Sequence, residues 1–168
     1  MNLNCYSIHK QVEFSECEYF GKLSNFNILC WFENIRFAIA RSSGIEKYFF
    51  PEHRSDKGVK EQGRQYFLMP VLKSYLKVYE EITIGCEVIV HAWIDKPIGS
   101  FLLFHYAITD VSCEKVFIRA EVSNGLVNSS NKIVTKMPEE LEKMIIHFID
   151  NIKENSHFYE LELKDEYI

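Results

Sequence analysis

Apolar residues occupy nearly every position between Asn27 and Arg41, a pattern that predicts a helix buried on most of its surface. The apolar positions are Ile28, Leu29, Trp31, Phe32, Ile35, Phe37, Ala38 and Ile39. Asn25 or Asn27 is available as the N-cap, and Ser42-Ser43-Gly44 provides a stop signal. At a rise of about 1.5 Å per residue, such a helix is about 22 Å long.

The remaining pattern is mostly that of strands. Alternation around Val12 and Phe14 predicts a first strand over Lys10–Cys17, which ends in a turn at Gly21. Longer strands are predicted over Tyr66–Tyr79, Ile82–Ile94, Ser100–Thr109 and Lys115–Val127. Their links are too short for crossover helices, so we expect an antiparallel meander joined at Glu80-Glu81, Lys96–Gly99 and Asp110–Ser112. The charged segment Pro51–Gln65 is expected to be a surface excursion.

Pro138 predicts the start of a second helix with an apolar stripe, and a polar tail follows it. The stripe consists of Leu141, Met144, Ile145 and Phe148. Strand, long helix, four strands and helix together predict one α+β domain over residues 1–168, in which a curved sheet wraps around the long helix. The edges of such long strands commonly end in a dimer interface.

Composition narrows the function classes. The formal net charge of -5 argues against broad nucleic-acid binding, which requires clustered Lys and Arg. No apolar run reaches the ~20 residues of a membrane helix, and the N-terminus lacks a signal-peptide core, so we expect a cytosolic protein. The five cysteines contain no CxxC pair, which favours reduced and mostly buried thiols over disulfides or a zinc site.

Two adjacent segments carry a motif. Phe14-Ser15-Glu16-Cys17-Glu18-Tyr19-Phe20-Gly21 is similar to F-x-D/E-x-D-x-x-G. The segment from Asn27 to Arg36 is similar to N-x-x-x-x-[WF]-[FL]-E-x-x-R, with one position fewer between Asn27 and Trp31. Joined in this order, they resemble the hot-dog-fold thioesterases of the 4-hydroxybenzoyl-CoA thioesterase-like group, including relatives that act on polyketide chains held by acyl carrier proteins. Looser similarity in strand order covers Lys10 to Val134. The resemblance implies a hot-dog fold, and here Glu18 stands where the family usually has Asp.

The resemblance also implies a site. Thioester hydrolysis needs an activated water or a carboxylate nucleophile, together with donors for the oxyanion. Glu18 would supply the carboxylate, and the backbone N–H of Asn25 at the helix start would supply a donor. Gly21 would allow close approach of substrate or an unusual backbone angle, while Lys22 and Asn27 are candidate substrate contacts. Each site would be completed in a homodimer or homotetramer, with no metal or cofactor.

Structural roles compete with these assignments. Composition alone favours Glu18 as a solvated carboxylate, and Asn27 as a cap or structural hydrogen bonder. Glu33 is better explained by pairing with Arg36 than as a second catalytic acid. His91 and His105 are expected to be hydrogen-bonded structural residues, and no local pattern supports a dehydratase histidine or a G-x-S-x-G hydrolase.

Three function hypotheses therefore remain. The first is a thioesterase acting on an acyl-CoA or an acyl carrier protein; the second is an acyl-binding protein without turnover; the third is an acyltransferase or polyketide-tailoring enzyme. CoA requires a few cations for its phosphates, whereas a carrier protein requires a broader basic patch. The candidate cations are Lys22, Arg54, Lys57, Lys60, Arg64, Arg119, Lys132 and Lys136.

Overall fold

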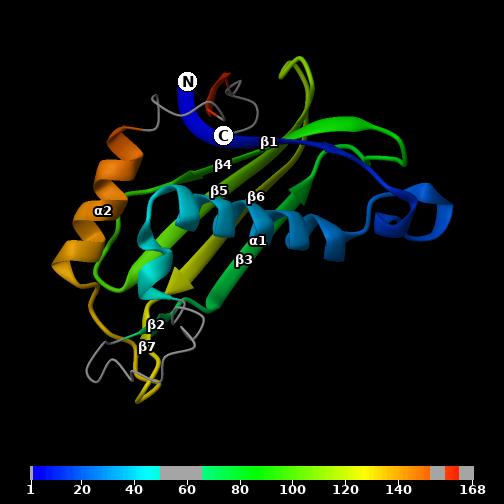
Figure 1. The fold of residues 1–168 in the computed structure, drawn as a ribbon. Coiled ribbons are helices and arrows are strands. Elements are labelled where there is room, and N and C mark those ends of the chain that lie inside the picture. Colours follow the sequence, from blue (N-terminus) through cyan, green and yellow to red (C-terminus); the bar gives the residue numbers. More distant parts are fainter. Residues whose placement is uncertain (1, 50–65, 152–157, 163–168) are drawn as a thin grey trace, which may run out of the picture.

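The computed structural model describes residues 2–49, 66–151 and 158–162. A six-stranded antiparallel sheet has the strand order β3-β6-β5-β4-β1-β8, and the long helix α1 crosses one of its faces (Figure 1). The strands are β1 (Asn2–Gln11), β3 (Val71–Val78), β4 (Glu87–Ile94), β5 (Phe101–Asp110), β6 (Val116–Gly125) and β8 (Phe158–Glu162). Strands β2 (Phe67–Leu68) and β7 (Val127–Asn128) form a separate two-stranded sheet. The predicted α+β class and the sheet around a helix are confirmed.

Helix α1 (Asn25–Ser42) confirms the predicted long helix. Its N-cap is Ser24, not Asn25 or Asn27, because the Ser24 hydroxyl accepts a hydrogen bond from the Asn27 backbone N–H at 3.2 Å. Gly44 follows the helix with a left-handed φ of 70°, so the predicted stop signal is confirmed.

The core lies between α1 and the sheet. Phe32 and Tyr106 stack there with ring centroids 4.3 Å apart. Helix α2 (Glu139–Asp150) closes one end of this core with the buried side chains of Leu141, Ile145 and Phe148, as the predicted stripe required (Figure 1). No helix among the described residues is long and apolar enough to span a membrane.

The predicted first strand, Lys10–Cys17, was wrong. Strand β1 ends at Gln11, and the chain then forms the short 3₁₀ helices η1 (Phe14–Glu16) and η2 (Tyr19–Gly21). The sequence of β1 shows no obvious apolar alternation, because some of the side chains that it buries are polar. Ser7 is buried and its hydroxyl lies 2.7 Å from Nδ1 of His91, which is also buried.

The predicted meander is only partly correct. Strands β4, β5 and β6 are sequential antiparallel neighbours, but β3 pairs with β6 and β4 pairs with β1. The link through Glu80-Glu81 is therefore not a hairpin. This link is instead bound to the segment before α1, because the Ile82 carbonyl accepts a hydrogen bond from the Leu23 backbone N–H at 2.8 Å.

Three further predictions concern the rest of the chain. The tail after α2, for which no element was predicted, contributes β8, which pairs with β1. None of the five cysteines, all of which lie among the described residues, forms a disulfide, but only Cys5 is buried and the other four are half-buried, so the expectation of mostly buried thiols was wrong. The predicted surface excursion over residues 51–65 lies outside the described residues.

Candidate active site

A tight loop connects β1 to α1 and carries the motif acids. The Glu18 backbone N–H donates to the Lys22 carbonyl at 2.9 Å, and the Gly21 N–H donates to the Glu18 carbonyl at 3.2 Å. Phe20 and Gly21 follow one another with left-handed φ values of 70° and 69°. The chain therefore reverses within a few residues, so that Glu18 pairs back with Lys22 shortly before α1 begins.

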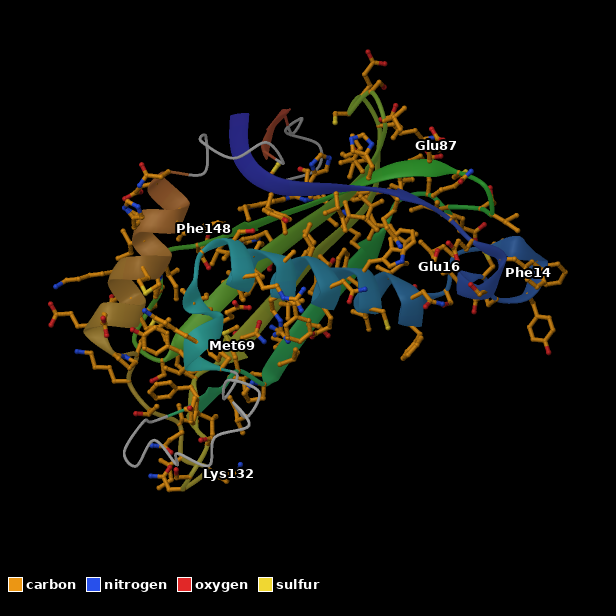
Figure 2. All side chains as sticks on the ribbon, in the orientation of Figure 1. Phe14, Glu16, Met69, Glu87, Lys132 and Phe148 are labelled. Carbon is orange, nitrogen blue, oxygen red and sulfur yellow. The ribbon has the colours of Figure 1, made fainter. Side chains whose placement is uncertain are left out.

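Glu16 fastens this loop to the helix. Its carboxylate accepts hydrogen bonds from the Trp31 indole N–H at 2.7 Å and from the Glu13 backbone N–H at 3.0 Å, and Lys10 Nζ lies 3.6 Å away. Burial raises the pKa of Glu16, but the Glu13 and Trp31 donors and the Lys10 charge outweigh that effect and hold the pKa below its usual value. Figure 2 shows Glu16 beside the N-terminal half of α1, whereas Phe14 projects away from the protein.

Glu18 has a different environment. Its side chain is exposed, and within the part of the chain that the structure describes its carboxylate has no hydrogen bond or ion pair. A carboxylate without protein partners is available to accept a proton from water or to attack an electrophile. Of the two motif acids, Glu16 is therefore held by hydrogen bonds within the protein, whereas the Glu18 carboxylate is exposed to solvent.

Unused backbone donors lie at the start of α1. Ser24 caps the Asn27 N–H and accepts the Ile28 N–H at 3.0 Å through its carbonyl. Among the hydrogen bonds of the described residues, none uses the N–H of Asn25 or Phe26. These N–H groups stand at the positive end of an 18-residue helix, where developing negative charge is stabilised.

Gly21, Lys22 and Asn27 are all engaged within the protein. Gly21 has the unusual backbone angle expected for it, and its carbonyl accepts from the Ile84 N–H at 2.8 Å. Lys22 Nζ lies 2.6 Å from the Glu81 carboxylate. The Asn27 amide donates to the Glu16 carbonyl at 3.0 Å and to the Ser24 hydroxyl at 2.9 Å, so its side chain ties the loop to the helix cap.

The residues expected to have structural partners have partners within the protein. Glu33 pairs with Arg36 at 2.5 Å, as predicted. His91 is buried between Ser7 and Thr109, with Nε2 lying 2.9 Å from the Thr109 hydroxyl. His105 Nε2 lies 3.0 Å from the Asp95 carboxylate. Among the candidate cations, Arg119 lies over a tryptophan ring, while Arg54, Lys57, Lys60 and Arg64 fall outside the described residues.

Sequence reasoning missed the part played by Glu16 and Trp31. The resemblance singled out Glu18 as the candidate catalytic acid, but it gave no role to Glu16 or to its contact with Trp31. The available signal was the presence of two acids two positions apart, Glu16 and Glu18. In the structure, Glu16 lies beside the helix and Glu18 lies in the turn where the chain reverses. The Trp31 donor lies 15 residues further along the sequence than Glu16, so only the fold identifies it as the partner.

No protein-family model and no curated protein matches this sequence. Among solved structures, the chain is similar to Slr0204, a 1,4-dihydroxy-2-naphthoyl-CoA thioesterase from Synechocystis, with a TM-score of 0.65 and 11% identity over 84% of this chain and 96% of that one. The dynemicin thioesterase has a TM-score of 0.65 and 13% identity over 86% and 96% of the two chains. SAV2348 from Staphylococcus aureus, solved in complex with CoA, has a TM-score of 0.68 and 14% identity over 90% and 87%. This chain therefore has the hot-dog fold that these thioesterase structures share.

Proposed function

We propose that this protein is an acyl thioesterase that uses Glu18 as its catalytic carboxylate. The observation that carries the proposal is the unpartnered Glu18 side chain on a loop fastened beside the unused N–H groups of Asn25 and Phe26. The hot-dog fold shared with solved thioesterases adds support. A carboxylate and an oxyanion donor are the two groups that thioester hydrolysis requires.

In the proposed reaction, the Glu18 carboxylate takes a proton from a water molecule as the water oxygen attacks the thioester carbonyl carbon. The carbonyl oxygen becomes an oxyanion, which the Asn25 N–H stabilises at the positive end of α1. When the tetrahedral intermediate collapses, the carbon–sulfur bond breaks and the thiolate leaves with the proton held by Glu18. The products are a carboxylic acid and a thiol. Direct attack by Glu18 would instead give an anhydride, which water then hydrolyses.

The proposed substrate is an acyl-CoA in preference to an acyl carrier protein. SAV2348, a similar structure, was solved with CoA. Lys22 is already paired with Glu81, so phosphate binding by Lys22 would require that exposed pair to open.

We further propose that the active form contains at least two copies of the chain. Strand β3 lies at the edge of the sheet and exposes four apolar side chains to solvent, namely Val71, Leu72, Tyr75 and Val78. An unpaired edge with exposed apolar residues is suited to pairing with a second copy. Light scattering should give a dimer or tetramer for the wild type and a smaller species for Tyr75→Lys; a wild-type monomer would contradict this part of the proposal.

Hydrolysis of a panel of aliphatic and aromatic acyl-CoAs, followed through release of free thiol, tests the proposed activity. The proposal predicts turnover of at least one member and its loss in folded Glu18→Gln. No turnover of any acyl-CoA, combined with tight binding, would favour a non-catalytic acyl-binding protein. Faster product formation with an added alcohol or amine, and an ester or amide as product, would favour an acyltransferase.

A further inference from the structure

A pocket of about 140 Å³ lies between the C-terminal half of α1, Phe49 at the end of the 3₁₀ helix η3 (Ile45–Tyr48), and the segment of strand β2. Its apolar lining consists of Phe37, Ala40, Phe49, Phe67, Leu68 and Met69. A cavity of about 150 Å³ with a similar lining binds benzene, so this pocket has room for a ring of that size or a few methylene groups. Its lining favours an apolar ligand over a charged one.

Arg36 completes the lining but offers no unpaired charge. Its guanidinium pairs with Glu33 at 2.5 Å, and Nη1 donates to the Met69 carbonyl at 3.5 Å. The arginine side chain is only 11% exposed, whereas the Glu33 side chain is 41% exposed. The guanidinium charge is therefore balanced on the protein, and an anionic ligand would have to compete with Glu33 for it.

The same helix connects this pocket to the proposed catalytic site. Asn25 begins α1, and Arg36, Phe37 and Ala40 line the pocket, so the pocket lies roughly 16–22 Å from Asn25 at the helical rise. Phe26, Cys30, Glu33, Phe37 and Ala40 recur at helical spacing and share one face. Phe26 and Phe37 are both exposed on that face, and the partly exposed Glu33 carboxylate, which is paired with Arg36, lies between them.

This distance sets a length for the acyl group. Carbon–carbon bonds of about 1.5 Å at tetrahedral angles advance about 1.25 Å each along an extended chain. We propose that the protein acts on straight-chain acyl groups of about 14 to 18 carbons, whose terminal methylenes occupy the pocket while the thioester lies at Asn25. This inference rests on the proposed thioesterase function and adds the substrate class to it.

The test compares Ala40→Leu with Asn34→Leu in hydrolysis of hexanoyl-CoA and palmitoyl-CoA. Ala40 is 6% exposed and lines the pocket, so a leucine there fills part of it; Asn34 is exposed on α1 outside the lining. Each buried methylene is worth about 0.8 kcal/mol, or roughly fourfold in binding. The palmitoyl-to-hexanoyl ratio of kcat/KM should therefore fall at least tenfold in Ala40→Leu and stay at the wild-type value in Asn34→Leu.

Two further measurements separate this inference from the proposed activity. Hydrolysis with the same ratio in both variants would overturn the pocket assignment and leave the thioesterase proposal standing. If no acyl-CoA is hydrolysed, calorimetry compares the binding of the hexadecyl and hexyl thioethers of CoA. Tighter binding of the hexadecyl thioether by the wild type, with this difference lost in Ala40→Leu, would support the pocket assignment. Equal binding of the two thioethers by the wild type would refute it. If Ala40→Leu fails to fold, Met69→Ala replaces it and should shift the preference toward longer chains; an unchanged preference would overturn the inference.

Discussion

Replacing Glu16 by Gln should destabilise the protein measurably, although the two side chains are nearly the same size. The carboxylate accepts the Trp31 and Glu13 N–H groups and lies near Lys10. An amide has only one oxygen, so one of the two N–H donors would face an NH₂ group. Hydrogen bonds to a charged group contribute about 1.5–3 kcal/mol each, and Trp31 is 2% exposed, so water cannot readily replace the lost acceptor.

The expected loss is therefore about 1.5–3 kcal/mol in the free energy of unfolding. For a chain of 168 residues this corresponds to a fall in Tm of roughly 3–12 °C, which circular dichroism would resolve. Glu18→Gln is the matched control, because it removes an exposed carboxylate without protein partners and should change the unfolding free energy by less than about 0.5 kcal/mol. Equal stabilities for wild type and Glu16→Gln would refute the argument that Glu16 fastens the loop to α1.

Two further predictions concern pH and backbone conformation. Burial and the nearby His9 lower the pKa of His91 to about 4. Because an unfolded histidine has a pKa near 6.5 and binds its proton more readily, stability should fall by up to about 3 kcal/mol as pH drops from about 6.5 to 4. Urea unfolding across this range should show the fall in the wild type and a flatter curve in His91→Gln; parallel curves would contradict it. Gly21→Ala should cost about 1 kcal/mol or more, since an L-residue must adopt the left-handed φ of 69°. An unchanged urea midpoint in this variant would show that the loop relaxes without cost.

Sequence reasoning identified those elements whose signal is local. Apolar residues are dense throughout the 18 residues of α1, and this pattern predicted a long buried helix. Helix α2 has its whole apolar stripe within 12 residues. Strand β1 could not be predicted from a local pattern, because the partner of its buried polar residue is distant in the sequence. Ser7 contacts His91, which lies 84 positions further along the chain. The pairing of β3 with β6 is likewise a long-range choice that strand lengths do not determine.

The candidate site divides in the same way. The resemblance of the two joined segments marked the loop around Glu18 and the start of the helix as the candidate site. They could not show that Glu16 is the acid held by Trp31, nor that Lys22 is paired with Glu81, because both partners lie outside the motif's acidic segment. The pocket beside Phe49 and Met69 was also beyond prediction, since its walls come from three separate parts of the chain.

In the proposed mechanism, Glu18 performs the chemistry, and Glu16 holds the loop that carries Glu18 against α1. The most direct measurement is kcat/KM for one hydrolysed acyl-CoA, taken for wild type and Glu18→Gln, with thermal unfolding recorded on the same preparations. If Glu18 is the catalytic carboxylate, kcat/KM should fall about 10²-fold or more in Glu18→Gln while the Tm stays unchanged. Activity of Glu18→Gln within twofold of the wild type would contradict it and remove Glu18 from the mechanism.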